Sequence, residues 1–317
     1  MAGSFIISLD FELHWGGVEI WSLNEKSKSF LNTRSVILEI LRLFEQYNIR
    51  ATWATVGFLF GSSREEVISC FPPEQPSYLN QSLNYYNLFY NEKVGLNESE
   101  DPYHFAFSII EKILKVPGQE LASHTFSHFY CNEPGQTQQQ FELDLRSAQN
   151  IANACLKSNL SSLVFPRNQY NKEYLKSIRS CGFTVVRTNP DAWFWKLNSK
   201  LAPIIRAADT LFPVSKRLTF KNSDITEEDD VTLLPASRFF RPYAEKEKFI
   251  QKLKMNRIKH EMSRAARKGE NYHLWWHPHN FGDYPHENLK QLKNILEHYA
   301  VLQRHYNFQS RSMSDFS

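Results

Sequence analysis

The sequence predicts an α/β protein in which parallel strands alternate with helices and form a barrel. Short runs rich in β-branched and aromatic residues alternate with segments whose apolar residues recur at helical spacing. Such alternation is typical of parallel strands, each joined to the next by a helix. About seven or eight such units suit a closed barrel, and an open, doubly wound sheet is the alternative. The length of 317 residues suits one large barrel domain with inserted loops.

The first part of the chain begins with a strand, a helix and a second strand. The strand is expected at residues 5–12 and the helix at 33–47, where apolar residues recur at helical spacing. The second strand, at 50–57, is rich in Thr, Val and Trp. Residues 58–117 break this rhythm, and we interpret them as a surface insertion that ends in a helix at about 103–115.

The remaining elements continue the alternation, and together they assign residues 1–317 to a single domain. The expected elements, in chain order, are a strand at 120–124, a helix beginning near Thr137, a strand at 162–167, a helix at 172–180, strands at 183–187 and 233–239, a charged helix at 245–267, a strand at 272–277 and a helix at 287–306. Residues 190–230 are irregular in pattern and are interpreted as a second insertion.

Composition and charge argue against several classes of protein. Apolar residues make up 42% of the chain, close to the ~45–50% of globular proteins, which argues against disorder. The 37 basic and 34 acidic residues leave a net charge of +3, too small to indicate a nucleic-acid or anionic membrane partner. No apolar run approaches the ~18 residues of a membrane span. The four cysteines form no CxxC pair and the first residues lack a signal-peptide pattern, so we expect a reduced, cytoplasmic protein.

Two acidic residues end the first predicted strand. Because side chains alternate between the two faces of a strand, Ser8, Asp10 and Glu12 share one face and apolar residues occupy the other. Catalytic groups gather at the carboxyl ends of strands in barrels and open sheets. We therefore interpret the acids as part of an active site; the alternative is a strand end at which both acids are merely hydrated.

Two histidines follow the third predicted strand, in the segment SHTFSH. His124 and His128 are four positions apart, which places both imidazoles on one side of a helical turn or compact loop. Two imidazoles and a carboxylate form a common ligand set for a catalytic zinc or similar metal. The alternative is a pair of surface histidines.

Two other strand ends carry residues suited to catalysis. His277 and His279 lie at or just past the end of the strand in LWWHPHN, and histidine titrates near pH ~6.5, as a general acid or base requires. The alternative is that they are core residues bonded to the backbone. Arg167, in VFPRNQ, could hold a catalytic carboxylate ionised and oriented, or it could be a surface arginine.

In this order the segments resemble the polysaccharide deacetylase family, which shares the NodB-homology domain of chitin-oligosaccharide and peptidoglycan deacetylases, enzymes of the carbohydrate esterase type. The resemblance rests on Asp-x-Glu after the first strand, ATWATVG, ELASHTFSH, an Arg/Pro strand end and a late histidine. It extends from Phe5 to about His279. It implies a distorted, TIM-like barrel of about seven strands.

The resemblance implies one metal site and a base. Asp10 matches the family's base, whereas Phe11 stands where the T-F-D-D motif has its metal-binding Asp. Glu12 fits a known Asp-x-Glu variant of that motif, although the roles of Asp10 and Glu12 could be exchanged. His124 and His128 match the metal histidines. With Glu12 they would hold one divalent transition metal, zinc being the first choice and cobalt, nickel or iron the alternatives.

The resemblance also implies an acid and supporting residues. His277 matches the late histidine that serves as general acid, and His279 is the alternative. Arg167 is assigned to orient Asp10, although the family places its Arg before the Pro and here the order is reversed. Asp191, in Asp-Ala-Trp, is assigned to support Arg167 or His277.

The implied activity is hydrolysis of an acetamido group on an N-acetylated sugar or glycan precursor, within surface polysaccharide metabolism. A cytoplasmic enzyme would meet a precursor rather than an exported polymer. The partner would be a carbohydrate or other small molecule. A hydrolase of small cyclic amides, resembling allantoinases and imidases, and a non-catalytic carbohydrate-binding relative are the alternatives. The sequence leaves the oligomeric state open.

Overall fold

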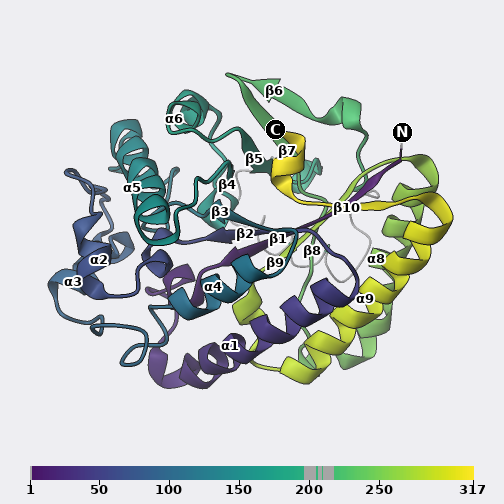
Figure 1. The fold of residues 1–317 in the computed structure, drawn as a ribbon, viewed down its shortest axis with the longest axis horizontal. Coiled ribbons are helices and arrows are strands. Elements are labelled where there is room, and N and C mark those ends of the chain that lie inside the picture. Colours follow the sequence, from purple (N-terminus) through teal and green to yellow (C-terminus); the bar gives the residue numbers. More distant parts are fainter. Residues whose placement is uncertain (1, 196–204, 206–208, 210–217) are drawn as a thin grey trace.

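The computed structural model describes residues 2–195, 205, 209 and 218–317. Helices surround a sheet of mainly parallel strands (Figure 1). The strands are β1 (Ser4–Phe11), β2 (Ala51–Thr55), β3 (Gln119–Ser123), β4 (Ser162–Val164), β5 (Val185–Thr188), β6 (Thr226–Glu228), β7 (Val231–Pro235), β8 (Arg238–Phe239), β9 (Tyr272–Trp276) and β10 (Gln309–Arg311). The helices are α1 (Leu23–Gln46), α2 (Arg64–Ser69), α3 (Tyr86–Tyr90), α4 (Phe107–Lys115), α5 (Gln138–Leu156), α6 (Leu175–Ser180), α8 (Gln251–Lys268) and α9 (Pro285–Tyr306).

The strand order confirms the predicted α/β fold. It runs β6-β7-β5-β4-β3-β2-β1-β9-β8, with β10 beside β1, and among the described pairs β6–β7 alone is antiparallel. The parallel part of this order runs from β7 to β8, and the segment between these two strands joins its ends, because β7 pairs with β5 and β8 pairs with β9. Between them, the Ala236 amide donates to the Thr188 carbonyl and the Ser237 amide to the His273 carbonyl. The chain itself, rather than a ladder between β7 and β8, therefore joins the ends of this distorted barrel.

Strand β1 alternates as the sequence predicts. Phe5, Ile7 and Leu9 are buried in the main core beneath the helices, whereas Ile6 belongs to a smaller core on the opposite face of the sheet. That second core also contains Ala54, Ala122, Val164, Val185, Phe220, Leu234 and Met313. The face of β1 that carries Ile6 also carries Ser8 and Asp10, so polar residues follow apolar ones toward the carboxyl end of the strand.

Capping explains where two helices begin. Thr137 caps α5 and forms a capping box with Gln140, which fixes the predicted start. Helix α1 begins at Leu23, well before residue 33, because the Ser22 side chain accepts a hydrogen bond from the Asn24 amide. Strands β6 and β10 were not predicted; each is three residues long and offers too short a pattern. No helix in the described ranges is long and apolar enough to cross a membrane.

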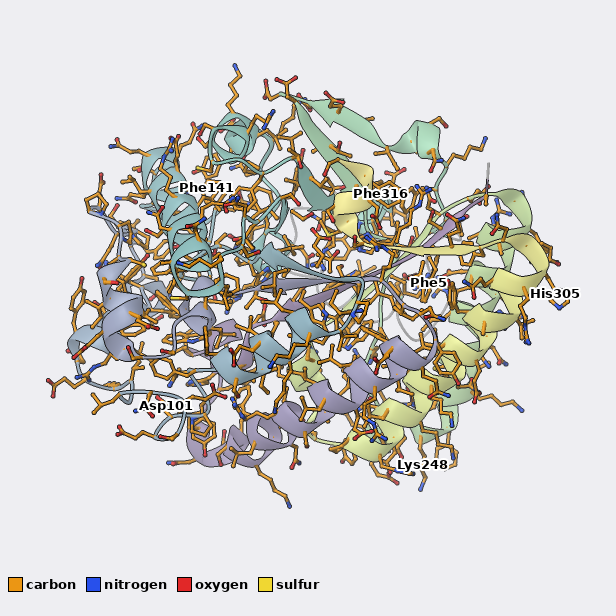
Figure 2. The ribbon with its side chains drawn as sticks, in the orientation of Figure 1. Phe5, Asp101, Phe141, Lys248, His305 and Phe316 are labelled. Atoms are coloured by element: carbon orange, nitrogen blue, oxygen red, sulfur yellow. The ribbon has the colours of Figure 1, made fainter. Side chains whose placement is uncertain are left out.

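The interpreted insertion at 58–117 packs into the fold. It forms α2, α3 and α4, and Phe58 and Phe89 are buried against Trp15, which follows β1. Phe141 lies on α5, where Figure 2 labels it. Its ring stacks on that of Phe165, with 5.8 Å between the ring centroids. About half of the second interpreted insertion, 190–230, lies outside the described residues, and β6 forms near its end.

Candidate active site

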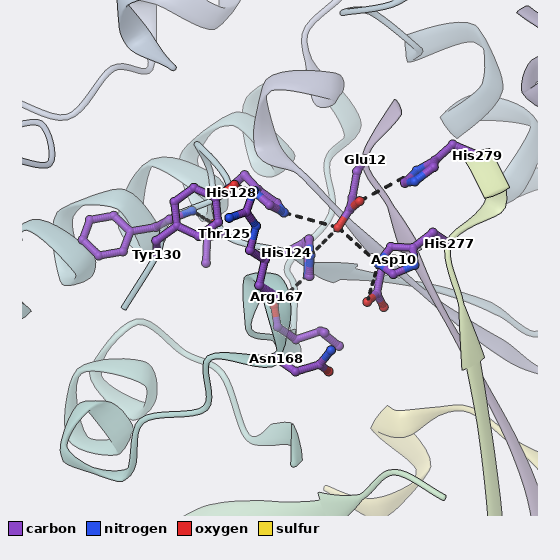
Figure 3. A network of polar contacts seen from close by, with 12 residues as sticks. Asp10, Glu12, His124, Thr125, His128, Tyr130, Arg167, Asn168, His277 and His279 are labelled. Atoms are coloured by element: carbon purple, nitrogen blue, oxygen red, sulfur yellow. Dashed lines mark hydrogen bonds and ion pairs between the residues drawn. The ribbon is translucent and has the colours of Figure 1, made fainter. Parts of the chain in front are cut away.

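Acidic and basic side chains converge from the loops that follow β1, β3 and β9 (Figure 3). Asp10 is near the end of β1 and Glu12 follows that strand. His124 follows β3 directly and His128 lies in the same loop. Both acids and both of these histidines are buried, whereas His277, which follows β9, has 24% of its side chain exposed. The acids and histidines singled out at the ends of β1, β3 and β9 are thus brought together, and the His277 side chain is partly exposed to solvent.

Glu12 and the two loop histidines lie close enough together to form a candidate metal-ligand set. The Glu12 Oε1 atom lies 2.9 Å from Nε2 of His124 and 3.3 Å from Nε2 of His128. The His124 Nδ1–H donates to the carbonyl oxygen of Val164 at 2.9 Å, so in the neutral ring the Nε2 lone pair faces the carboxylate. Lone pairs facing a carboxylate at this distance repel unless a cation lies between them. The three residues therefore fit a divalent transition metal.

A chain of hydroxyl groups orients His128. Its Nδ1 atom lies 3.0 Å from the Tyr130 hydroxyl, which lies 2.8 Å from the Tyr85 hydroxyl. Tyr85 donates to the Glu19 carboxylate, which also forms an ion pair with Arg167. Contacts of this kind hold a ligand imidazole in one orientation.

The predicted pairing of Arg167 with Asp10 is not present in the structure. Arg167 follows β4 in a tight turn with a φ of 51°, and its side chain is directed to Glu19 and to the Tyr130 ring, 4.6 Å from the guanidinium. Asp191 is exposed in the loop after β5, and the described contacts of Arg167 do not include it.

Arg187 of β5 lies beside Asp10 instead. Its Nη1 and Nη2 atoms donate to the two carboxylate oxygens of Asp10 at 2.6 and 2.8 Å. Burial by itself would raise the pKa of Asp10, but the Arg187 guanidinium outweighs it and lowers that pKa below its ordinary value. Arg187 was not predicted as a site residue, although it ends the strand predicted at 183–187, where a polar side chain at a strand end is expected to face the site.

His277 and His279 occupy different surroundings. The His277 Nε2 atom lies 3.6 Å from Asp10 Oδ2 and 3.7 Å from Glu12 Oε1, and the side chain is partly exposed. His279 is buried against Trp21, its Nδ1 has no hydrogen-bond partner, and burial lowers its pKa to about 3. The described contacts of His277 do not include Asp191. His277 is therefore better placed to meet a substrate.

The loops around the site contain strained backbone. Five residues other than glycine have positive φ there, in the loops after β1, β3 and β4: Leu13 (48°), Thr125 (62°), His128 (60°), Arg167 (51°) and Asn168 (53°). For a β-branched residue such as Thr125 this conformation is unfavourable, and such strain persists where surrounding contacts impose it.

Asp144 of α5 imposes the shape of the histidine loop. Its carboxylate accepts from the Phe126 amide at 2.7 Å and from the Ser127 amide at 3.2 Å, and it also bonds to the Ser127 hydroxyl. Burial raises the pKa of Asp144 to about 6. Asp144 was not predicted as a site residue, because a single acid inside a predicted helix does not indicate which loop it contacts.

Comparison with known proteins bears on both fold and family. The family model for polysaccharide deacetylase matches residues 31–186. A putative polysaccharide deacetylase from Mycobacterium smegmatis is 12% identical, with a TM-score of 0.59 over 99% of this chain and 88% of that chain. A probable polysaccharide deacetylase from Pseudomonas aeruginosa PAO1 is 11% identical, with a TM-score of 0.57 and the same coverage. At these identities the structural likeness concerns the fold.

A curated relative matches a smaller part of the chain. The U3 small nucleolar RNA-associated protein 25 homolog of Rattus norvegicus is 29% identical over 120 residues. The match covers 36% of this chain and 16% of that relative. The chain thus corresponds to a small part of the relative's length.

The fold and the clustered acids and histidines are those of a barrel-like α/β protein that resembles the carbohydrate deacetylases. Residues 31–186, just under half of the chain, match the polysaccharide deacetylase family model, and the whole chain shares its fold with two solved structures that are named as polysaccharide deacetylases. The matched range contains His124 and His128, while Asp10, Glu12 and His277 lie outside it.

Proposed function

We propose that this protein is a metal-dependent hydrolase that removes the acetyl group from an N-acetylated sugar. One observation carries the proposal. Imidazole nitrogens of His124, His128 and His277 all lie within 3.7 Å of Glu12 Oε1, next to an Asp10 held by Arg187. This cluster unites the three groups that amide hydrolysis requires: a ligand set, a base and an acid.

Glu12, His124 and His128 would hold the metal. Carboxylate and imidazole ligands suit zinc first, and cobalt, nickel or iron as well. When bound, such an ion polarises an amide carbonyl and lowers the pKa of water.

Asp10 acts as the base in this proposal. The two bonds from Arg187 keep the carboxylate ionised and fix its plane, so it can accept a proton from the attacking water. Burial of Asp10 and Arg187 excludes bulk water from this pair.

His277 acts as the acid. An amine leaves poorly as an anion, so a proton must reach the nitrogen as the C–N bond breaks. The partly exposed His277 lies beside both carboxylates, where its Nε2–H can face the leaving group. Hydrolysis then yields acetate and a free amino sugar.

The substrate is proposed to be an acetylated glycan precursor. The cytoplasmic location expected from the sequence stays a prediction, which cell fractionation would test. Acetate released from nucleotide-linked or lipid-linked N-acetyl sugars supports the precursor, and activity on exported polymer alone contradicts it.

Metal analysis and acetate release test the function together. Elemental analysis of the wild-type protein should give about one equivalent of a divalent transition metal, and N-acetylglucosamine oligomers should yield acetate. His124→Ala should lose both, whereas His305→Ala, exposed at the end of α9, should keep both. No metal in the wild type after reconstitution would overturn the proposal. Ring opening of cyclic amides without acetate release would favour the imidase-like alternative.

A further inference from the structure

A buried polar chain lies beneath the Asp10 carboxylate. Ser8 of β1, His273 of β9 and Arg187 of β5 are 0–3% exposed. The Ser8 Oγ atom lies 2.8 Å from His273 Nε2 and 3.0 Å from Arg187 Nη1. The far side of the His273 ring contacts the Pro235 carbonyl oxygen, 3.1 Å from Nδ1. Four strands, β1, β5, β7 and β9, therefore contribute to one continuous hydrogen-bonded chain that ends at Arg187.

The hydrogen bonds of this chain have a single direction. A carbonyl oxygen accepts only, so His273 Nδ1 carries the proton that it donates to Pro235. Burial lowers the pKa of His273 to about 3, and the neutral ring leaves Nε2 as an acceptor. Ser8 must then donate its one hydroxyl proton to Nε2, which leaves its oxygen to accept from Arg187. Every donor in the chain has one acceptor.

We propose that Ser8 and His273 are positioning residues that fix the Arg187 guanidinium, and through it the Asp10 carboxylate, for deacetylation. The inference rests on the proposed function, since it gives Asp10 the role of base. It assigns a task to two residues that lie outside the ligand set and too deep to touch a substrate.

The surroundings of Arg187 support this assignment. The residue extends from β5 to meet Asp10 on β1, and these two strands are not neighbours in the sheet. Nη2 also donates to Asn168 at 3.1 Å, and the Trp275 ring lies 4.5 Å from the guanidinium. Ser8 supplies the acceptor on the Nη1 side, opposite Asn168. A displacement of ~1 Å in a catalytic group can cost ~10²-fold in rate, so a fixed guanidinium matters.

Two substitutions of His273 separate its two contacts. His273→Gln keeps an acceptor near the position of Nε2, whereas His273→Asn keeps a donor near Nδ1 and loses the contact with Ser8. We expect kcat for acetate release from N-acetylglucosamine oligomers to fall ~10–100-fold in His273→Asn and in Ser8→Ala. KM and metal content should stay unchanged, and His273→Gln should restore most of kcat.

The kcat of a variant with both substitutions distinguishes a positioning role from a general structural role. Because Ser8 and His273 act in one chain, Ser8→Ala with His273→Asn should lose no more kcat than either change alone. Additive losses, or equal losses in His273→Asn and His273→Gln, would overturn the proposal.

Nuclear magnetic resonance tests the hydrogen-bonded chain from His273 to Arg187 by a measurement that does not depend on enzymatic activity. In the wild-type protein, Arg187 Nη1 and Nη2 should give separate ¹⁵N signals because the guanidinium cannot rotate, and in His273→Asn these signals should broaden or merge. If wild-type protein releases no acetate but the signals behave in this way, the proposed function fails and the positioning chain stands. Unchanged signals in a His273→Asn protein that still releases acetate would contradict the positioning role of Ser8 and His273 and would leave the proposed function standing.

Discussion

The two ends of the barrel both enclose carboxylates, but they surround them differently. At the carboxyl end of the strands, Asp10 and Glu12 face an arginine and several histidines, which outweigh burial and lower the pKa of both acids. Near the opposite end, Glu120 of β3 accepts from the Thr52 hydroxyl at 2.6 Å and the Ser314 amide at 3.0 Å. There burial dominates and raises the pKa of Glu120.

This difference separates function from stability. Basic partners keep the acids at the carboxyl end ionised, as the proposed base and the proposed metal ligand must be. The other end is closed by the segment after β10, whose Met313 is fully buried in the smaller core and whose amide donates to Thr52. In barrels, residues at the carboxyl ends of strands serve catalysis and those at the amino ends serve stability.

Asp10→Asn should give the largest contrast between the ends. The amide has nearly the shape of the carboxylate but cannot accept a proton, so kcat for acetate release should fall ~10³-fold with metal content unchanged. Glu120→Gln, the matched change at the other end, should leave kcat unaltered. Turnover near that of the wild-type protein in Asp10→Asn would remove Asp10 from the mechanism.

His277→Ala and His279→Ala should differ in kcat, and this difference shows which histidine at the carboxyl end acts as the acid. Loss of the acid should lower kcat ~10²-fold in His277→Ala, and added imidazole should restore part of it because the side chain is partly exposed. His279→Ala leaves a closed cavity beside Trp21, so its kcat should fall less and should not respond to imidazole. The reverse pattern would transfer the role of acid to His279.

Local patterns in the sequence predicted much of this arrangement. The alternation around Asp10 and Glu12 showed which side chains share a face, and the spacing of His124 and His128 indicated a common side. Each of these patterns lies within a few residues. They therefore predict the strand and its polar end, and they single out the three residues that the structure brings close enough to hold a metal ion.

Contacts between distant segments were not predictable in this way. Arg187 meets Asp10 across 177 positions of sequence, and Asp144 contacts Phe126 across 18. A single sequence does not state which buried arginine pairs with which acid. Arg167 was chosen for its motif, yet the turn after β4 directs it to Glu19. Such pairings depend on how strands cross the barrel, which only the assembled fold determines.

Met313→Ala should alter stability without altering catalysis. Removing this buried side chain leaves a cavity among small apolar residues and should lower the free energy of unfolding by ~2–4 kcal/mol. Urea denaturation measures this loss, and kcat of the folded fraction should equal that of the wild-type protein. Phe316→Ala, at a side chain only partly buried against the same core, serves as the milder comparison. A fall in kcat at unchanged stability would contradict the assignment of catalysis to the carboxyl end and of stability to the opposite end.

Glu120→Gln should give the smallest effect, a change in melting temperature at neutral pH that is opposite in sign to the change caused by Asp10→Asn. The folded-state pKa of Glu120 lies above its ordinary value of 4.5, so its contribution to stability is complete below that value and is lost as pH rises through the folded-state pKa. The variant should therefore melt ~2 °C higher than the wild-type protein at pH 7, which corresponds to about 1 kcal/mol in the free energy of unfolding. At pH 4 its melting temperature should show no such gain. The pKa of Asp10 is lowered, so its contribution is present above its ordinary value of 3.8 and is lost as pH falls. Thermal melts of both variants across this pH range measure the difference. At neutral pH the melting temperature should rise in Glu120→Gln and fall in Asp10→Asn, each relative to the wild-type protein. Shifts of the same sign would contradict the electrostatic difference between the two ends.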